Sequence, residues 1–311
     1  MSMQCRLLVR ITVLFGGLIL PVAGQAQAPV LSSPADWLQA MHHAVHHLNY
    51  EGHVVYQVGS DLEVMHLHHE GKATGEVEHL NVLSGTPHQI LRGSGAMHHI
   101  QGPDEKQQSH DQHVLDMNCL FDYQQMLPHY RLRLGEKHRV AGRLAQILYI
   151  EPQDALRYGR RLYLDQETKL PLRSVLLDHQ QQPLAQTLFT DLTLKKSPMV
   201  AMQHPSHTHT DKSDLFAVAQ RWQFVTLPAG FKMKLHHYLS QEKREHFIFS
   251  DGLSMISLYI EPWVKGSLEG FSKQGATWIL GARRHNQRMT LLGKVPQETL
   301  LQVVDSARPT P

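Results

Sequence analysis

Histidine, which can bind a metal ion or carry a proton, occurs 24 times in the 311 residues of this chain. The pairs His42/His46 and His43/His47 have the i, i+4 spacing that lets two imidazoles share a divalent ion. A zinc site needs three or four convergent ligands, usually with help from cysteine or carboxylate. The chain has only two cysteines and no HExxH sequence, so we expect no metal ion and no other cofactor. A pH-sensing role stays open, because imidazole titrates near ~6.5.

Signatures of catalysis are missing from the sequence. There is no G-x-S-x-G nucleophile elbow. There is no phosphate-binding P-loop, and GSGAMH at residues 93–98 lacks the spacing of a dinucleotide loop. These absences predict a binding protein rather than an enzyme, and a metal-dependent hydrolase is favoured only by the number of histidines.

The segment RYGRRLYLDQETKLPLRS, residues 157–174, combines strand-forming residues with a concentration of arginines. A turn at residues 166–168 predicts a β-hairpin. Guanidinium groups bind phosphates and carboxylates through paired hydrogen bonds, so an acidic lipid or an acidic peptide is one candidate ligand. Charge that protects an exposed sheet edge explains the same residues equally well. The candidate residues for anion or partner contact are Arg157, Tyr158, Arg160, Arg161 and Arg173.

Large apolar side chains form a second group of candidates. A sheet that curls around an apolar interior can hold one hydrophobic ligand. Exposed aromatic residues can equally face a protein partner. The candidates are Trp37, Met41 and Tyr56 for a ligand, and Phe249, Tyr259 and Trp263 for a partner surface. Ordinary hydrophobic core is the alternative for all six.

The first 26 residues have the composition of a secretory signal peptide. Arg6 and Arg10 precede an apolar run at residues 11–20, and small residues follow in VAGQAQA. The run is shorter than the ~20 apolar residues of a transmembrane helix, so we expect export and cleavage of the signal peptide. Loss of the two arginines takes the formal charge from +2 to zero. A nucleic-acid partner is therefore not expected, because such proteins are normally basic.

The elements that would position the candidate residues begin with a helix. Ser33, Pro34 and Asp36 predict a capped helix start. Residues 37–48 are apolar at three-four spacing, and the four helical histidines fall on the opposite, solvated face. Between residues 50 and 194 apolar residues recur at every second position, in roughly ten short segments separated by turns. This pattern predicts a half-open antiparallel β-barrel with the helix packed against it.

Composition divides the rest of the chain. The N-terminal domain is expected at residues 27–194, and within it RVAGRLAQILYIEP, residues 139–152, is expected as one long strand. Residues 195–213 are rich in proline and hydroxyl side chains and predict a linker. Residues 214–311 predict a smaller α+β domain. Its strands are expected at 222–227, 231–239, 245–252, 253–262 and 288–296, followed by a helix at 296–307.

Several runs along the chain resemble the MucB/RseB family of periplasmic sigma-E regulatory proteins. They are VAGRLAQILYIEPQDALRYGRRLYLDQETKLPLRS, LPAGF at residues 227–231, FSDGLSMISLYIE at residues 249–261, and LLGKVPQETL. The runs occur in the family's order, and the resemblance covers essentially the whole mature chain. The residues that match the family pattern are Arg157, Tyr158, Gly159 and Arg161 in the hairpin, and Ser250, Asp251 and Gly252 in the second domain.

The resemblance implies both a fold and a function. The fold is α+β, with an N-terminal half-barrel like those of lipoprotein carriers and a smaller C-terminal domain. The implied location is the periplasm, and the implied function is negative regulation: the protein binds the periplasmic part of a membrane-spanning anti-sigma factor and shields it from proteolysis. Lipopolysaccharide or lipoprotein acyl chains are the implied releasing signals. A lipoprotein or lipid carrier is the alternative, although carriage needs no second domain. The sequence leaves open whether the protein forms a homo-oligomer.

Overall fold

The computed structural model describes residues 33–72, 75–85, 88–93, 96–101, 122–195, 221–239 and 243–310. The predicted signal peptide and nearly all of the predicted linker lie outside these ranges. No helix among the described residues has the length and apolar character needed to cross a membrane.

Helix α1, Pro34–His47, begins with the predicted capping box. The Ser33 hydroxyl accepts a hydrogen bond from the backbone N–H of Asp36 at 3.1 Å, and the Asp36 carboxylate accepts one from the N–H of Ser33 at 3.0 Å. The helix buries the predicted apolar face, made of Trp37, Leu38, Met41, Ala44 and Val45. Of its histidines, His43 and His47 are exposed, whereas His42 and His46 are partly buried.

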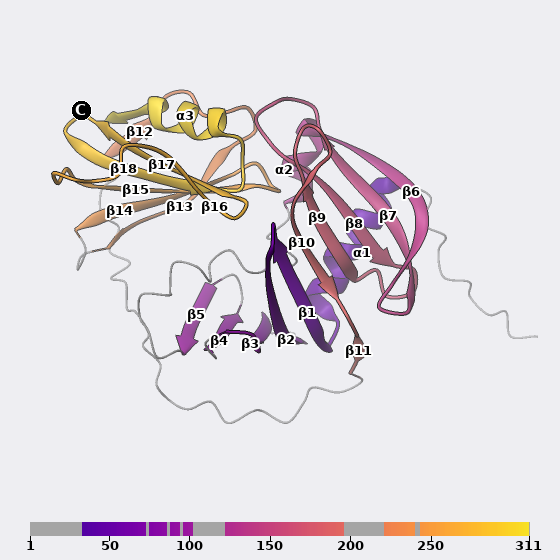
Figure 1. Cartoon of the computed structure of the whole chain (residues 1–311). Helices are drawn as coiled ribbons and strands as arrows, with labels where there is room; N and C mark the ends of the chain where they lie inside the picture. Colours follow the sequence, from indigo (N-terminus) through magenta and orange to yellow (C-terminus); the bar gives the residue numbers. More distant parts are fainter. Residues whose placement is uncertain are drawn as a thin grey trace, which may run out of the picture. The chain divides into compact units, whose positions relative to one another are not determined.

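The N-terminal sheet is antiparallel and open. Its strands are β1 Tyr50–Val58, β2 Asp61–Lys72, β3 Gly75–Val82, β4 His88–Gly93, β5 Ala96–Gln101, β6 Tyr130–Val140, β7 Arg143–Pro152, β8 Gly159–Asp165, β9 Pro171–Leu177, β10 Pro183–Phe189 and β11 Thr193–Leu194. They lie in the order β5-β4-β3-β2-β1-β10-β9-β8-β7-β6, with β11 paired to β1, and the two end strands do not meet. Helix α1 contacts β2, β6 and β7 (Figure 1). The half-open sheet with a packed helix is therefore confirmed.

One predicted strand proved to be two. Residues 139–152 contain the end of β6, a tight turn and the whole of β7. The turn residues Ala141 and Gly142 both have left-handed backbones, with φ of 50° and 72°. Before β6 lie two short helices that the sequence pattern did not indicate, α2 at Tyr123–Met126 and the 3-10 helix η4 at Leu127–His129.

The C-terminal domain is a second antiparallel sheet backed by one helix. Its strands are β12 Trp222–Phe224, β13 Lys232–Leu239, β14 Arg244–Ser250, β15 Met255–Pro262, β16 Gly270–Gln274, β17 Thr277–Arg284, β18 Gln287–Gly293 and β19 Ala307–Pro309, and its helix is α3 Gln297–Ser306. The main sheet has the order β13-β14-β15-β18-β17-β16, and β12 pairs with β19. Helix α3, predicted at residues 296–307, buries Leu300, Val303 and Val304 in the core of this domain. Hairpin β16–β17 was not predicted.

Histidines of α1 contact one another without forming a metal site. The His43 and His47 rings stack with centroids 4.1 Å apart, and those of His42 and His46 meet edge to face at 4.5 Å. In the part of the chain that the structure describes, no three His, Cys, Asp or Glu side chains are grouped to hold a metal ion.

One histidine of the C-terminal sheet is buried. His246 on β14 is 8% exposed, its ring stacks on Tyr259 at 4.2 Å, and its Nδ1 lies 3.3 Å from the Nε2 of His237. Burial, helped by the neighbouring His237 and Arg244, lowers the pKa of His246 to about 3. The folded state therefore holds this imidazole neutral at pH values where the unfolded chain protonates it.

We predict that His246 makes the protein sensitive to acid. Because its pKa is lower in the folded state, its contribution to stability is complete above ~6.5 and is lost as the pH falls toward 3. The loss approaches about 1.4 kcal/mol per pH unit in this window. Urea unfolding between pH 7 and pH 4 should show a flatter pH dependence for His246→Gln than for wild type. His43→Gln, at an exposed position, should keep the wild-type slope, and equal slopes for all three proteins would contradict the prediction.

Candidate functional site

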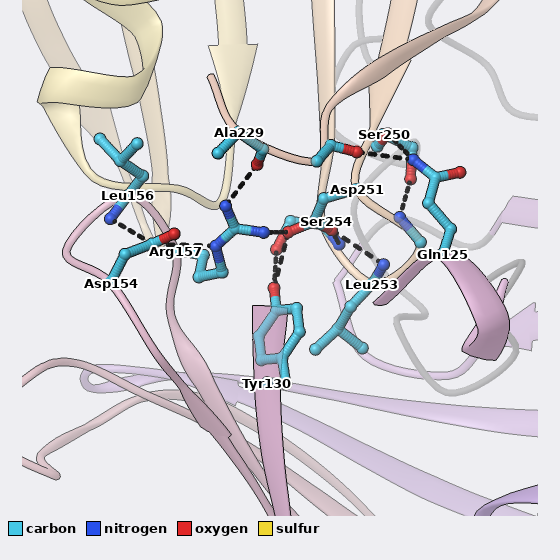
Figure 2. A network of polar contacts seen from close by, with 12 residues as sticks. Gln125, Tyr130, Asp154, Leu156, Arg157, Ala229, Ser250, Asp251, Leu253 and Ser254 are labelled. Atoms are coloured by element: carbon cyan, nitrogen blue, oxygen red, sulfur yellow. Dashed lines mark hydrogen bonds and ion pairs between the residues drawn. The ribbon is translucent and has the colours of Figure 1, made fainter. Parts of the chain in front are cut away.

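Three of the short sequence runs that resemble the MucB/RseB family meet around one buried arginine. Arg157, in the loop between β7 and β8, has 0% exposure. Its Nε donates to Asp154 at 2.9 Å, its Nη1 to Asp251 at 2.8 Å, and its Nη2 to the carbonyl oxygen of Ala229 at 2.5 Å (Figure 2). The guanidinium of the N-terminal domain thus binds two loops of the C-terminal domain, one before β13 and one between β14 and β15.

Asp251 is the acceptor on which this network converges. It is also fully buried. One carboxylate oxygen accepts the backbone N–H groups of Leu253 and Ser254, at 2.9 and 2.7 Å, and so fixes its own turn. The other oxygen accepts Arg157 and the Tyr130 hydroxyl, which lies 2.8 Å away (Figure 2). A single carboxylate therefore links a turn of the second domain to two side chains of the first.

Hydrogen bonds to backbone groups also join the two domains in this region. The side-chain amide of Gln125 donates to the carbonyl oxygens of Gly230 and Ser250, at 2.8 and 2.6 Å. The N–H of Asp122 donates to the carbonyl of Gly252 at 3.0 Å. Gly252 has a φ of +95°, and a Cβ there would collide with the Asp122 carbonyl oxygen. Only glycine fits both the backbone angle and the close approach.

An apolar patch continues this junction between the two domains. Tyr158, Leu176 and Ala185 of the N-terminal domain are buried together with Ala276, in the turn between β16 and β17. Two polar contacts flank the patch. Lys294 Nζ lies 3.2 Å from the Tyr56 hydroxyl, and the Thr299 hydroxyl donates to the carbonyl of Leu156 at 2.6 Å. The junction thus combines an apolar contact with a buried ion pair.

The charges at the junction stabilise one another. Burial disfavours the charged form of Arg157, but the hydrogen bond to Asp154 and the charge of Asp251 raise its pKa above the ordinary value. Burial raises the pKa of Tyr130 well above its usual range, and the charge of Asp251 raises it further. For Asp154 burial acts against ionisation, yet the hydrogen bonds from Arg157 and the Leu156 N–H lower the pKa. Arg157 is thus a cation and Tyr130 a neutral donor at neutral pH.

The structure separates the candidate residues of the hairpin into three places. Arg157 and Tyr158 lie at the junction, and Tyr56 joins them there. Arg160 is buried, at 5% exposure, and opposes Ile150 and Leu176 in the sheet. Arg161 and Arg173 come together on the other face of the sheet, beside Tyr163.

The remaining candidates pack within their own domains. Trp37 and Met41 are buried on α1, with Lys169 Nζ 4.4 Å from the Trp37 ring centroid. Phe249 belongs to the core of the C-terminal domain. Tyr259 is partly buried and stacks on His246. Trp263 is partly buried, with the Arg283 guanidinium 5.0 Å from its ring.

Sequence reasoning did not select four residues that complete the network, namely Tyr130, Gln125, Asp154 and Ala229. Asp251 was named only as a residue that matches the family pattern, without a contact. An arginine and an aspartate separated by 94 residues leave no pairing signal in one sequence. The usable signal was the glycine that follows Asp251, because a positive φ at a turn is a local requirement.

We predict that Arg157→Met is strongly destabilising. The substitution leaves Asp251 buried without its cation, which costs about 3–5 kcal/mol in comparable buried pairs. Arg133→Met is the matched control, because Arg133 is 52% exposed and pairs with Glu151 at 3.0 Å. Its expected cost is at most about 1 kcal/mol. Urea unfolding at neutral pH measures the loss in the free energy of unfolding for both variants.

A double-mutant cycle tests whether the pair itself is responsible. Because an asparagine at position 251 carries no charge to be left unpaired, Arg157→Met and Asp251→Asn together should cost less than the sum of the two single changes. The expected coupling is about 1–3 kcal/mol. Additive effects would show that Arg157 stabilises the fold through packing alone.

Family models match the chain on both sides of the junction. The model of the MucB/RseB N-terminal domain matches residues 33–213, and that of the MucB/RseB C-terminal domain matches residues 217–308. Among curated proteins, the sigma factor AlgU regulatory protein MucB of Pseudomonas aeruginosa is 29% identical, over 95% of this chain and 96% of its own length. The sigma-E factor regulatory protein RseB of Escherichia coli is 20% identical, over 91% of this chain and 93% of its own.

Solved structures agree with these matches. MucB alone superposes with a TM-score of 0.70 and 28% identity, over 89% of this chain and 98% of that chain. MucB in complex with MucA(peri) superposes with a TM-score of 0.68 and 28% identity, over 90% of this chain and all of that chain. The two family models together account for most of the sequence, so this chain belongs to the MucB/RseB family.

Proposed function

We propose that this protein is a periplasmic negative regulator of a sigma-E envelope-stress response. It binds the periplasmic segment of a membrane-spanning anti-sigma factor and shields that segment from proteolysis. Lipopolysaccharide or lipoprotein signals release it. It acts by binding and not by catalysis, and it reaches the periplasm after removal of a signal peptide at residues 1–26.

The observation that carries the proposal is the full-length likeness to a protein solved with its partner. The likeness to MucB in its complex with MucA(peri) extends over 90% of this chain and includes both domains. A lipid carrier would need the half-open sheet alone. Retention of the second domain, together with the names of the curated relatives as sigma factor regulatory proteins, therefore supports regulation over carriage.

The junction supports a function that uses both domains at once. Two charged residues, Arg157 and Asp251, are fully buried where the domains meet, and burying charge is favourable only when each group keeps its partner. Separation of the domains would expose both groups and break the hydrogen bonds to Tyr130 and Ala229. A partner that contacts both domains would therefore meet surfaces that the junction holds together.

Calorimetry tests the proposal directly. We expect saturable binding when residues 27–311 are titrated with the periplasmic segment of the cognate anti-sigma factor. Binding should weaken when lipopolysaccharide is present, because two ligands that favour different states oppose each other's binding. Absence of binding in both conditions, with a folded protein, would contradict the proposal. Lipid binding without anti-sigma affinity would point to the carrier instead.

Two variants test whether binding of the anti-sigma segment depends on the junction. We predict that Arg157→Met lowers the affinity for the anti-sigma segment about tenfold or more, because loosening the domains adds an ordering cost to binding. Arg284→Met is the matched control, since Arg284 forms an exposed ion pair with Asp305 at 2.9 Å. It should bind as wild type does. Equal affinities for all three proteins would show that the partner does not need the junction.

A further inference from the structure

Two arginines of the N-terminal sheet share one face around a single aromatic ring. Arg161 and Tyr163 are two residues apart on β8, so their side chains leave the sheet on the same side. Arg173 on β9 directly opposes Tyr163 and shares that side. The Arg161 guanidinium carbon lies 5.9 Å from the centroid of the Tyr163 ring, and that of Arg173 lies 5.1 Å from it.

The charge of these two arginines is not neutralised within the described residues. Arg161 forms no hydrogen bond or ion pair there, and its Nε is buried without a partner. Arg173 donates through Nε and Nη2 to the side-chain oxygen of Gln186, at 3.1 and 2.5 Å. Gln186 is neutral and is itself held by Gln57 at 2.6 Å. The Arg173 guanidinium is thus oriented while its charge remains unpaired.

Two other arginines of the N-terminal domain each have a carboxylate partner. Arg133 has Glu151 and Arg157 has Asp154 as carboxylate partners. The nearest acid along β8, Asp165, already accepts hydrogen bonds from Arg143 at 2.9 Å and from the Thr168 hydroxyl at 2.7 Å. No carboxylate in the described part of the chain lies within ion-pair distance of Arg161 or Arg173. Both uncompensated guanidinium groups therefore lie beside the same buried ring, that of Tyr163.

We propose that Arg161 and Arg173 form a binding site for a phosphate monoester. Two guanidinium groups carry two positive charges, and a phosphate monoester carries about −1.5 to −2 at neutral pH. A carboxylate, with a single negative charge, would leave one guanidinium unbalanced. The planar donors of arginine also match phosphate oxygens, which can accept several hydrogen bonds at once. The partly buried position beside Tyr163 strengthens the attraction, because water screens the charges less there.

The site does not depend on anti-sigma binding. The Arg161–Arg173 site lies on the β8–β9 face away from Arg160, whereas the junction uses Arg157 and the loop that precedes β8. Phosphate binding can therefore be measured in the protein alone. Its outcome and that of the anti-sigma titration are independent.

Calorimetric titration of residues 27–311 with inorganic phosphate tests the site. Wild type should bind phosphate more tightly than acetate. Arg161→Gln and Arg173→Gln should each weaken phosphate binding about tenfold, the effect of losing a charge-assisted hydrogen bond. Arg133→Gln is the matched control, because Arg133 lies on the same face opposite Tyr149 but is paired with Glu151. It should change the affinity less than about twofold, as expected for an arginine already paired at the surface.

Recruitment to lipid vesicles shows whether the phosphate group belongs to a lipid or to a free compound. Phosphatidylcholine vesicles are prepared with and without phosphatidic acid, which bears a phosphate monoester. Recruitment only to the phosphatidic acid vesicles, lost in Arg161→Gln, would assign the site to a lipid headgroup. Phosphate binding without recruitment would assign it to a free phosphate compound. Both results support the site.

Three results would overturn the proposal. They are no phosphate binding by the wild type, equal phosphate affinity in the wild type and both glutamine variants, and acetate binding as tight as phosphate binding. Thermal unfolding of each variant checks that the fold is intact. If Arg161→Gln does not fold, Arg161→Lys replaces it. Lysine keeps the charge but loses the planar fork, so a loss of phosphate affinity in this variant would still support the site.

Discussion

The buried pair of Arg157 and Asp251 is the interaction on which the relation between the two domains depends. Neither group has any exposed surface, and a buried charge that loses its partner is costly by several kcal/mol. The same carboxylate fixes the turn that follows β14 by accepting two backbone N–H groups. A substitution of Asp251 therefore affects its own turn, the loop before β8 and Tyr130 on β6. This shared dependence explains why sequence runs far apart in the chain meet in one place.

Steric constraints act together with this charge pairing. Gly252 and Gly230 both have positive φ, and side chains there would collide with Asp122 and His129 of the N-terminal domain. Tyr158 and Ala276 are buried in one apolar cluster across the junction. Arg157 and Asp251 are themselves fully buried, so water screens their attraction less than it would at the surface. Arg161 and Arg173 lie together on one face of the same sheet, and neither forms an ion pair with a carboxylate in the described part of the chain. The segment at residues 157–173 thus places Arg157 in the loop before β8, at an internal contact, and Arg161 and Arg173 on one face of the β8–β9 pair.

Local signals in the sequence predicted local structure well. The capping box at Ser33 and the three-four spacing after it predicted α1 correctly, because both depend on residues within one or two turns. The turn at Ala141 was missed, since alanine rarely adopts a positive φ and carries no turn signal. Hairpin β16–β17 was missed because β16 is almost wholly exposed and lacks an apolar alternation. The partners of Arg157 could not be predicted, because contacts over such separations arise only after the sheets have formed.

Differential scanning calorimetry of the wild-type protein is the most direct test of the claim that the junction unites the domains. A single transition is expected, with equal calorimetric and van't Hoff enthalpies, because both domains should unfold as one cooperative unit. Two resolved transitions, or a calorimetric enthalpy about twice the van't Hoff value, would mean that the domains unfold independently. That result would contradict the central role of Arg157 and Asp251 in joining the domains.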